Sequence, residues 1–509
     1  MFRKIVKMNI LLVYPNINGQ FQIQMGLASI SAVLKQAGHR IDLFDTTFIV
    51  SGSFEEVSVQ FMKRFDEVLA KFKEKVSSSK PDIILVGIRS LEFDFATKLL
   101  REAKTNLPVI FGGQHPTVSP EEVIKSDVAD YICIGEGEEA ILELIEKLES
   151  NEDVTKINNI WVKKDGKIYR NPVRPLMKNL DELPFPDWDI FDARHVSTIG
   201  KFETSRGCPY SCTYCINSYM QKIYGGVGGY HREKSIKKTI EEMEQFLKKF
   251  PQVNYIWLID ETFTLNNDRV KDFCEQYKEK IKDKFNVKFG CMTRPEVLSE
   301  EKCQYLKKAG CVEIAMGIEM GNETYRVEML DRKMTQQSII NAFLMAKKSG
   351  IKTYSFNMVG FPNETRKDII NTIELNRKGK VDEIQVTIFY PFKGTSLRDF
   401  CEENNLLDLP RNEVGSYYEK PVIKNPNLPK KEVMGLFRTF TIYCKSPKIF
   451  WPFIKIMEYD NLVSINLSRI ANTFIKQGFK PKAFGIFFDY AYNNVLKVPK
   501  LLDKLTILI

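Results

Sequence analysis

The sequence predicts an α/β protein with three parts: a doubly wound domain over residues 1–150, a partial (βα)6 barrel over residues 200–400 and a helical region over residues 401–509. Two observations predict this class. In the first 150 residues, short aliphatic or β-branched runs alternate with amphipathic stretches of helical period, which is typical of a parallel sheet covered by helices on both faces. From about residue 200 the alternation returns with longer helices, and six strand–helix units in succession favour a partial barrel.

Five strands are expected in the first domain, at "MNILLVYP", "HRIDLFD", "PDIILVGI", "LPVIFGG" and "ADYICIG". Folds of this kind bind ligands beyond the carboxyl ends of their strands. The loops expected there contain Gly112 and Gly113, and Gly135 and Gly137. Glycines let the backbone approach a ligand closely, although turns alone also require them. We therefore expect a ligand of this domain to lie at these four glycines.

A connector, residues 151–199, follows the first domain. Residues 159–172 are expected to form a β-hairpin, because two alternating runs are joined by Asp165 and Gly166, a favoured pair for a type I′ turn. The proline-punctuated segment "LPFPDWD" (183–189) is expected to cross to the barrel in an extended conformation.

The barrel strands are expected at "KFETSR", "VNYIWLID", "VKFGCMT", "CVEIAMGIE", "KTYSFNMVG" and "EIQVTIFYP". In barrels of parallel strands the working residues stand at the carboxyl ends of the strands. The segment "SRGCPYSCTYC" lies directly after the first strand and brings Cys208, Cys212 and Cys215 within eight positions. We therefore place the catalytic centre at these three cysteines.

Three closely spaced cysteines have two main interpretations. A structural zinc site normally takes four protein ligands, and zinc here would need a distant fourth, because the four histidines make no paired ligand motif (His39, His115, His195 and His231). A cubane iron–sulfur cluster has four irons, each of which seeks a ligand that is normally a cysteine thiolate. Three cysteines leave one iron open to a ligand that is not protein, which favours a 4Fe–4S cluster.

The spacing C-x-x-x-C-x-x-C, with the aromatic Tyr214 before the last cysteine and a barrel strand before the first, resembles the radical S-adenosylmethionine (SAM) superfamily. The resemblance implies that the open iron binds the amino and carboxylate groups of SAM. One electron from the cluster would then cleave SAM to a 5′-deoxyadenosyl radical. The resemblance also implies that Tyr214 lines the adenine pocket, that a reductase or a ferredoxin-type protein donates the electron, and that the chemistry is anaerobic.

Four side chains at later strand ends match the same superfamily. Asp260 and Glu261 ("IDETF") stand where members carry an acidic pair, which implies contact with the SAM ammonium. Arg294 ("MTRP") offers a charge-assisted partner for a carboxylate. Glu319 ("GIEMG") resembles the G-I-E-x-G motif, which implies a position near the ribose or the methionyl group. The alternative for each is an ordinary strand-end cap or ion pair.

The first domain resembles the Rossmann-like cobalamin-binding domain of one radical SAM family, which includes the Mg-protoporphyrin cyclase-like and hopanoid-methylase-like enzymes. The segments "GGQHPTVSPEEV" and "DYICIGEGEEAI" carry this resemblance. It implies a TIM-type radical SAM barrel behind a domain that binds cobalamin, with Gly112, Gly113, His115, Gly135 and Gly137 at the cofactor.

The chain departs from the cobalamin-binding pattern in one respect. The signature D-x-H-x-x-G, which supplies an axial histidine to cobalt, is absent, and residues 14–20 after the first strand contain no histidine. We expect cobalamin to bind without a histidine from this loop. His115 is either a ligand of cobalt or, more simply, part of a turn that frames the cofactor's tail. A methylthiotransferase is excluded, because its N-terminal domain holds a second cluster on three cysteines and this domain has only Cys133.

Composition excludes several other classes of protein. We find no secretory signal and no run of roughly 18 apolar residues that could span a membrane. The ten cysteines are scattered and do not form a disulfide framework. We therefore expect the protein to lie in a reducing cytoplasm. The net charge of +9 is concentrated in residues 430–509, where 13 Lys/Arg and five Asp/Glu give +8. The rest of the chain is near neutral, which argues against nucleic-acid binding.

Residues 430–509 also carry fourteen aromatic residues on stretches of helical period. Basic amphipathic helices with aromatic faces suit an anionic membrane surface, so peripheral membrane contact is one interpretation. The other is that the aromatic faces pack over the barrel and leave the lysines in solvent.

The resemblance implies a reaction class. In this group the commonest chemistry is methyl transfer to an unactivated carbon of a small molecule or lipid: the deoxyadenosyl radical removes hydrogen, methylcobalamin delivers the methyl group, and a second SAM recharges cobalamin. One alternative keeps the cofactors but performs oxidative cyclisation, ring contraction or carbon–carbon coupling. A different class is a non-catalytic iron–sulfur assembly protein, and cleavage of SAM would exclude it.

Overall fold

The computed structural model describes residues 7–17, 21–49, 64–225, 229–409 and 420–476. The chain divides into two compact units. The first comprises Met1–Phe263, Lys271–Phe289 and Phe392–Ser396, and the second comprises Thr264–Val270, Gly290–Pro391 and Leu397–Ile509.

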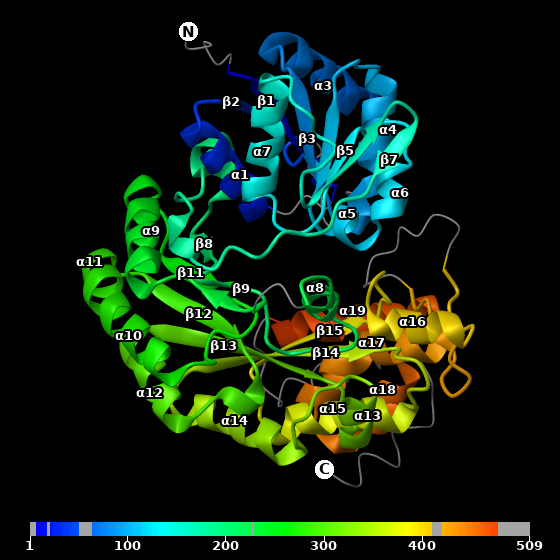
Figure 1. Ribbon diagram of the computed structural model, residues 1–509. Helices are drawn as coiled ribbons and strands as arrows, with labels where there is room; N and C mark the ends of the chain where they lie inside the picture. The colour runs from blue at the N-terminus through cyan, green and yellow to red at the C-terminus, as the bar shows by residue number, and fades with distance from the viewer. Residues whose placement is uncertain (1–6, 18–20, 50–63, 226–228, 410–419, 477–509) are drawn as a thin grey trace. The chain divides into compact units, whose positions relative to one another are not determined.

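The first unit begins with a seven-stranded sheet of order β2-β1-β3-β4-β5-β6-β7 (Figure 1). The first five strands are parallel, as predicted, and β6 and β7 add to one edge as an antiparallel hairpin. Asp165 and Gly166 in the hairpin turn both have positive φ, 50° and 74°, as a type I′ turn requires. The strands are β1 (Asn9–Tyr14), β2 (Arg40–Asp45), β3 (Ile83–Gly87), β4 (Val109–Gly112), β5 (Tyr131–Cys133), β6 (Ile160–Lys164) and β7 (Lys167–Tyr169).

Helices cover both faces of this sheet. Alternate residues of β1 enter two different cores: Leu11 and Val13 pack with α3, α4 and α6, whereas Ile10 and Leu12 pack with α1 and α7. Burial on both faces explains why the strands are continuously apolar, since each buried aliphatic side chain contributes about 1.5–3 kcal/mol. The helices are α1 (Met25–Gln36), α3 (Phe65–Ser79), α4 (Phe93–Ala103), α5 (Gln114–Val118), α6 (Pro120–Ile124) and α7 (Glu138–Glu149).

Strands β8 and β11–β15 form one six-stranded sheet of order β15-β14-β13-β12-β11-β8, the partial barrel that the sequence predicts. Its strands follow one another in chain order, and the pairs β8–β11, β13–β14 and β14–β15 are parallel. The strands are β8 (Ile199–Phe202), β11 (Tyr255–Leu258), β12 (Lys288–Thr293), β13 (Cys311–Glu319), β14 (Lys352–Val359) and β15 (Glu383–Ile388).

The first barrel strand differs from its prediction. The expected strand "KFETSR" is interrupted: β8 ends at Phe202, and a separate short strand β9 (Ser205–Arg206) pairs in antiparallel fashion with β10 (Arg232–Glu233). The interruption follows from hydrogen bonding, because the backbone N–H of Thr204 donates to the Asp260 carboxylate instead of to a neighbouring strand.

Side-chain caps start several of the barrel helices. The hydroxyls of Ser235, Ser299 and Thr335 accept hydrogen bonds from the first turns of α9, α12 and α14, and Thr365 and Asp368 make a capping box on α15. The helices from residue 200 to residue 403 are α8 (Ile216–Ile223), α9 (Ile236–Lys249), α10 (Asn267–Tyr277), α11 (Asp283–Phe285), α12 (Glu300–Ala309), α13 (Glu323–Glu328), α14 (Gln336–Lys348), α15 (Arg366–Lys378) and α16 (Ser396–Glu403).

Three C-terminal helices pack within the second unit: α17 (Lys430–Lys445), α18 (Trp451–Ile456) and α19 (Leu462–Lys476). Their apolar faces share a core with α15 and the ends of β14 and β15, in which Leu436, Phe440 and Leu467 are fully buried. Packing therefore accounts for the apolar faces of these three helices, while residues 477–509 of the predicted amphipathic region lie outside the described residues. Within the described ranges, the helices lack the length and apolar character that crossing a bilayer demands.

Candidate functional site

The three cysteines of the motif lie on the loop between β9 and α8, in the first unit. Cys208 and Cys212 are buried and Cys215 is partly buried. The loop turns back on itself, because the N–H of Cys215 donates to the carbonyl of Cys212 at 3.0 Å and Cys215 is the N-cap residue of α8. Gly207, with φ of 79°, is required here, since a Cβ would lie 2.3 Å from the carbonyl oxygen of Tyr230.

The arrangement of these thiols bears on the kind of metal centre. Among the described residues, no group of three or more His, Cys, Asp or Glu side chains converges on a point where one metal ion would sit. A zinc ion needs such convergence, whereas a cubane offers its irons at separate corners, so its cysteines point to different atoms. The donor set, three thiols and no histidine, fits an iron–sulfur cubane with one iron free of protein. All ten cysteines are free of disulfides.

Burial favours the neutral thiols of Cys208 and Cys215 when no cation is bound. It raises the pKa of Cys208, and it raises the pKa of Cys215 to about 12, with the carboxylate of Glu261 adding to both shifts. Iron offsets this cost, because a coordinated thiol is deprotonated by the charge of the metal. The site is therefore built for a cationic centre.

Asp260, one of the predicted acidic pair, is buried immediately after β11. Its carboxylate accepts hydrogen bonds from the N–H and the hydroxyl of Thr204, at 3.1 and 2.8 Å, and from the hydroxyl of Ser205. Burial nevertheless raises the pKa of Asp260. The Asp260 carboxylate thus accepts its hydrogen bonds from protein groups, which favours the interpretation of this residue as a strand-end cap.

Glu261, the second member of the pair, has a different environment. Its side chain lines a cavity of the first unit. The surrounding protein raises the pKa of Glu261 by desolvation, and a hydrogen bond with Asn217 opposes the shift. Glu261 is therefore the acidic residue that a bound ligand can reach.

Arg294 and Glu319 belong to the second unit, at the ends of β12 and β13. The Nε of Arg294 donates to the Glu296 carboxylate at 2.6 Å, and the guanidinium is buried. Glu319 has φ of 62°, a left-handed conformation that costs about 1 kcal/mol or more for a residue with a Cβ. Its carboxylate lies 4.0 Å from Arg332. Tyr214, the aromatic of the cysteine motif, is partly buried.

One cavity of about 320 Å³ brings predicted residues of both domains together within the first unit. Its lining comes from the strand ends of the seven-stranded sheet and from the start of the barrel. The first domain contributes Gly112, Gly113, Cys133, Gly135, Glu136 and Gly137 to this lining, and the start of the barrel contributes Arg206, Gly207, Tyr230 and Glu261.

The glycines make a bare backbone surface in this cavity. Among the described residues beyond its chain neighbours, a Cβ on Gly112 would come within 4 Å only of the Cβ of Cys133, at 3.9 Å, and Gly112 lines the cavity. Gly113 and Gly135 have positive φ, and a Cβ there would lie 2.7 Å from the carbonyl oxygen of Ile88 and 1.8 Å from the hydroxyl of Tyr224. The first domain thus offers a cradle that fits the close approach of a large cofactor.

His115 does not line this cavity. The imidazole is buried, with Nδ1 3.1 Å from the hydroxyl of Ser90 and Nε2 3.6 Å from the Glu122 carboxylate, and its ring packs on Phe93. Both nitrogens face groups of the first unit, which favours the turn-framing alternative for this residue.

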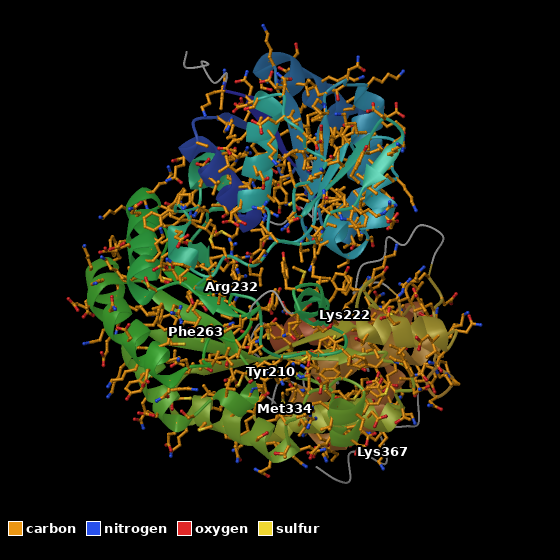
Figure 2. The ribbon with its side chains drawn as sticks, in the orientation of Figure 1. Tyr210, Lys222, Arg232, Phe263, Met334 and Lys367 are labelled. Carbon is orange, nitrogen blue, oxygen red and sulfur yellow. The ribbon has the colours of Figure 1, made fainter. Side chains whose placement is uncertain are left out.

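An ionic network that no sequence motif predicts lies beside the cavity. The guanidinium of Arg232, labelled in Figure 2, forms two hydrogen bonds with the Glu136 carboxylate, one of them at 2.9 Å. Arg206 donates to Glu138 at 2.7 Å and to Glu203 at 2.9 Å. The strand pairing that places Arg232 opposite Arg206 joins residues 26 positions apart, so no local sequence pattern predicts it.

Comparisons with known proteins identify two domains in the chain. The model of the radical SAM superfamily matches residues 202–375, and that of the B12-binding domain matches residues 19–145. The chain is 28% identical over 458 residues to an uncharacterized methyltransferase of Pyrococcus horikoshii, covering 87% of this chain and 94% of that protein. It is 23% identical over 441 residues to the anaerobic magnesium-protoporphyrin IX monomethyl ester cyclase of Synechocystis, covering 84% and 82%.

A solved structure shares the fold. The radical SAM methyltransferase TsrM of Kitasatospora setae, whose structure holds cobalamin and a 4Fe–4S cluster, superposes with a TM-score of 0.62 at 16% identity, over 78% of this chain and 75% of that one. The two domain matches carry the conclusion. The chain therefore contains a B12-binding domain followed by a radical SAM domain, and its cofactors are a 4Fe–4S cluster, SAM and cobalamin.

Proposed function

We propose that the protein is a methyltransferase that adds a methyl group to an unactivated carbon of a small-molecule or lipid substrate. The observation that carries this proposal is the cavity whose lining combines the glycine cradle of the cobalamin-binding domain with Arg206, Gly207 and Glu261 beside the cysteine loop. When bound, the cluster and SAM supply a 5′-deoxyadenosyl radical and cobalamin supplies a methyl group. Both are needed at one substrate carbon, so one shared cavity suits this chemistry.

On the barrel side, we assign Cys208, Cys212 and Cys215 as the ligands of three irons. Glu261 receives the SAM ammonium, because its carboxylate faces the cavity and charge-assisted hydrogen bonds to an ammonium are strong. Asp260 acts as a positioning residue that holds Thr204 and Ser205 ahead of the cysteine loop.

Three further residues are assigned to SAM from their sequence motifs. We assign Tyr214 to the adenine, Arg294 to a carboxylate and Glu319 to the ribose or the methionyl group. The strained backbone of Glu319 supports its assignment, since residues in sparsely populated conformations concentrate at functional sites.

On the side of the first domain, Gly112, Gly113, Gly135 and Gly137 hold cobalamin by close backbone contact. The cobalt receives no histidine from residues 14–20, because this loop contains none. His115 serves by keeping the turn after β4 in place, where its imidazole contacts Ser90.

A second candidate function is oxidative cyclisation with the same cofactors. It is favoured by the similarity to cyclases, which extends over 84% of this chain for the Synechocystis protein. The two candidates differ in their use of SAM: methyl transfer consumes a second SAM and releases S-adenosylhomocysteine, whereas cyclisation needs only the radical.

The test uses the anaerobically purified protein with a reductant and an extract that contains the substrate. We expect 5′-deoxyadenosine and S-adenosylhomocysteine in about equal amounts for methyl transfer. The variant in which Cys208, Cys212 and Cys215 are all replaced by alanine should lose its iron and form neither product, while Cys401→Ala, a buried cysteine outside the motif, should keep both. Coupled deoxyadenosine without S-adenosylhomocysteine would reject methyl transfer in favour of cyclisation.

Peripheral membrane contact through residues 430–509 is also part of this proposal. Four of the large apolar side chains that remain exposed lie in one short stretch around the start of α19: Ile449, Tyr459, Leu462 and Val463. They accompany the +8 charge of the region, and apolar and basic side chains together favour an anionic lipid surface.

A further inference from the structure

We propose that helix α8 is a spacer that fixes the cysteine loop against the two glycine loops of the cobalamin-binding domain, with Tyr219 and Tyr224 as its positioning residues. This inference rests on the proposed function, because it concerns the geometry between the two cofactor sites of that reaction. All the residues involved lie in the first unit.

The helix is attached to the cysteine loop along its whole length. Cys215 is its N-cap residue, and the hydroxyl of Ser218 donates to the Cys215 carbonyl at 2.7 Å. One turn later, the side-chain amide of Gln221 donates to the carbonyls of Cys208 and Tyr210, at 2.5 and 3.0 Å. The helix and the backbone that carries the cysteines therefore move as one body.

The two tyrosines attach the same helix to the first domain. The hydroxyl of Tyr219 donates to the carbonyl of Thr117 at 3.2 Å, in the short helix α5 that follows β4 and Gly113. The hydroxyl of Tyr224, at the end of the helix, accepts the backbone N–H of Glu136 at 3.0 Å, in the loop after β5. Each tyrosine thus holds one of the two loops that contain the paired glycines.

Thr117 joins these two loops to each other. Its hydroxyl donates to the carbonyl of Gly113 at 2.8 Å and accepts the N–H of Gly135 at 2.9 Å. A displacement of α8 is therefore transmitted to both halves of the glycine cradle, because the halves are hydrogen-bonded together.

Close packing leaves the two rings little freedom to shift. A Cβ on Gly135 would lie 1.8 Å from the Tyr224 hydroxyl, and a Cβ on Gly394 would lie 2.8 Å from the Tyr219 ring, so only glycine backbone fits against either side chain. The Tyr224 side chain is buried and stacks on Tyr230, which itself lines the cavity.

The ionic network gives the spacer a second anchor. Glu136, whose N–H meets Tyr224, is also the residue whose carboxylate meets Arg232. Strand β10, which carries Arg232, pairs with β9, which leads directly into the cysteine loop. Two anchors at different points fix an orientation as well as a distance. The helix between Cys215 and Tyr224 spans about 13 Å at its standard rise.

This geometry matters because radical and methyl-transfer steps need the reacting atoms within about 3–3.5 Å of each other, and a misplacement of about 1 Å lowers the rate steeply. We therefore expect the two tyrosine hydroxyls to act on coupling between the cofactor sites, and not on the loading of either cofactor.

The test compares the wild type with Tyr219→Phe, Tyr224→Phe and the double variant. Tyr277→Phe is the matched control, because this buried tyrosine also donates to a carbonyl, that of Val287 at 3.4 Å, away from the cavity. Hydrogen exchange of peptides that cover residues 113–117 and 135–138 is measured on protein that holds the cluster alone. Loss of each hydroxyl should increase the exchange rate of these peptides by about 5-fold, because that factor corresponds to the free energy of one ordinary hydrogen bond.

The second readout uses protein loaded with both cofactors. In the double variant, iron and cobalamin contents should match the wild type. The magnetic interaction between the reduced cluster and Co(II), seen by electron paramagnetic resonance, should become more heterogeneous, and deoxyadenosine should exceed product. If Tyr224→Phe loses iron, the proposal is tested by comparing Tyr219→Phe with the wild type and with Tyr277→Phe.

Unchanged exchange in both single variants would overturn the spacer, whatever reaction the enzyme performs. A wild type that binds no cobalamin would instead reject the proposed function and leave the exchange result as the test of the spacer. An equal increase of exchange in Tyr277→Phe would also overturn the spacer proposal, because it would show a general loss of stability.

Discussion

Asp260 accepts two hydrogen bonds from Thr204, one from its backbone N–H at 3.1 Å and one from its hydroxyl at 2.8 Å. This pair ties the end of β11 to the residue at which the first barrel strand is interrupted, immediately ahead of the cysteine loop. The two neighbouring carboxylates thus have different roles, since Asp260 supports the backbone at Thr204 and Glu261 lines the cavity.

The first prediction separates these two carboxylates. Asp260→Ala leaves buried donors of Thr204 and Ser205 without an acceptor, so we expect it to lower the free energy of unfolding by about 1–3 kcal/mol and to reduce the iron content. Glu261→Gln should keep the iron and the thermal midpoint of the wild type. It should raise the KM for SAM in deoxyadenosine formation by about 10-fold, because a charge-assisted hydrogen bond is lost. A KM for SAM unaltered in Glu261→Gln would remove Glu261 from the SAM site.

The second prediction concerns the glycine cradle. Gly112→Val should fill the cavity without a clash, because Cys133 alone among the residues described in the structure approaches the new Cβ, at 3.9 Å. We expect it to abolish the cobalamin absorbance that stays with the protein after desalting, and to leave the thermal midpoint within a few degrees of the wild type. Gly135→Val is the contrasting variant, since its Cβ would overlap the Tyr224 hydroxyl and its φ is positive, so it should lower the midpoint as well. Full retention of cobalamin by Gly112→Val would place the cofactor elsewhere.

The third prediction concerns pH. Glu364, in the loop after β14, is fully buried: one carboxylate oxygen accepts the N–H groups of Gly360 and Phe361, and the other has no hydrogen-bond partner within the described part of the chain. Burial raises the pKa of Glu364 from its ordinary 4.5 to about 8. The folded protein therefore holds a proton that the unfolded chain has released, so this group stabilises the fold at acid pH and its contribution is lost as the pH rises through about 8.

We accordingly expect the thermal midpoint of the wild type to fall between pH 6 and pH 9 by more than that of Glu364→Gln. Comparing slopes cancels the other groups that titrate in this range, because they are common to both proteins. Parallel slopes would show that Glu364 has an ordinary pKa.

The fourth prediction concerns lipid. Each Lys or Arg near an anionic surface contributes about 1 kcal/mol, and salt screens this attraction. The full chain should float with anionic vesicles at low salt and be released by high salt. A chain that ends at Lys476 retains the packed helices α17–α19, so it should fold like the full chain. It should bind anionic vesicles less strongly than the full chain, and Leu462→Asp should weaken this binding further. If none of the three floats, packing alone explains the composition of this region.

Much of the fold follows from local patterns. Strand–helix alternation predicts both sheets, and Asp165-Gly166 predicts the hairpin turn, because these features depend on neighbours along the chain. The interruption between β8 and β9 could not be predicted, since its cause is a hydrogen bond between Thr204 and Asp260, 56 residues apart.

The site shows the same division. The cysteine motif is a local signal, and so are the glycine pairs. The roles of Asp260 and Glu261 cannot be separated in the sequence, because adjacent residues at a strand end point in different directions. Glu136, Tyr224 and Arg232 carry no motif either: their contacts span 88 and 96 residues, and only the folded chain brings them together.

The central claim, methyl transfer at the shared cavity, is tested most directly with SAM that carries three deuterium atoms in its methyl group. The cluster-loaded, cobalamin-loaded protein is reduced in the presence of a substrate-containing extract, and the products are analysed by mass spectrometry. We predict a product heavier by about 3 mass units than the one formed with unlabelled SAM, formed together with S-adenosylhomocysteine, and absent with Gly112→Val, which should bind no cobalamin. A product that forms with coupled deoxyadenosine but takes up no deuterium would contradict methyl transfer.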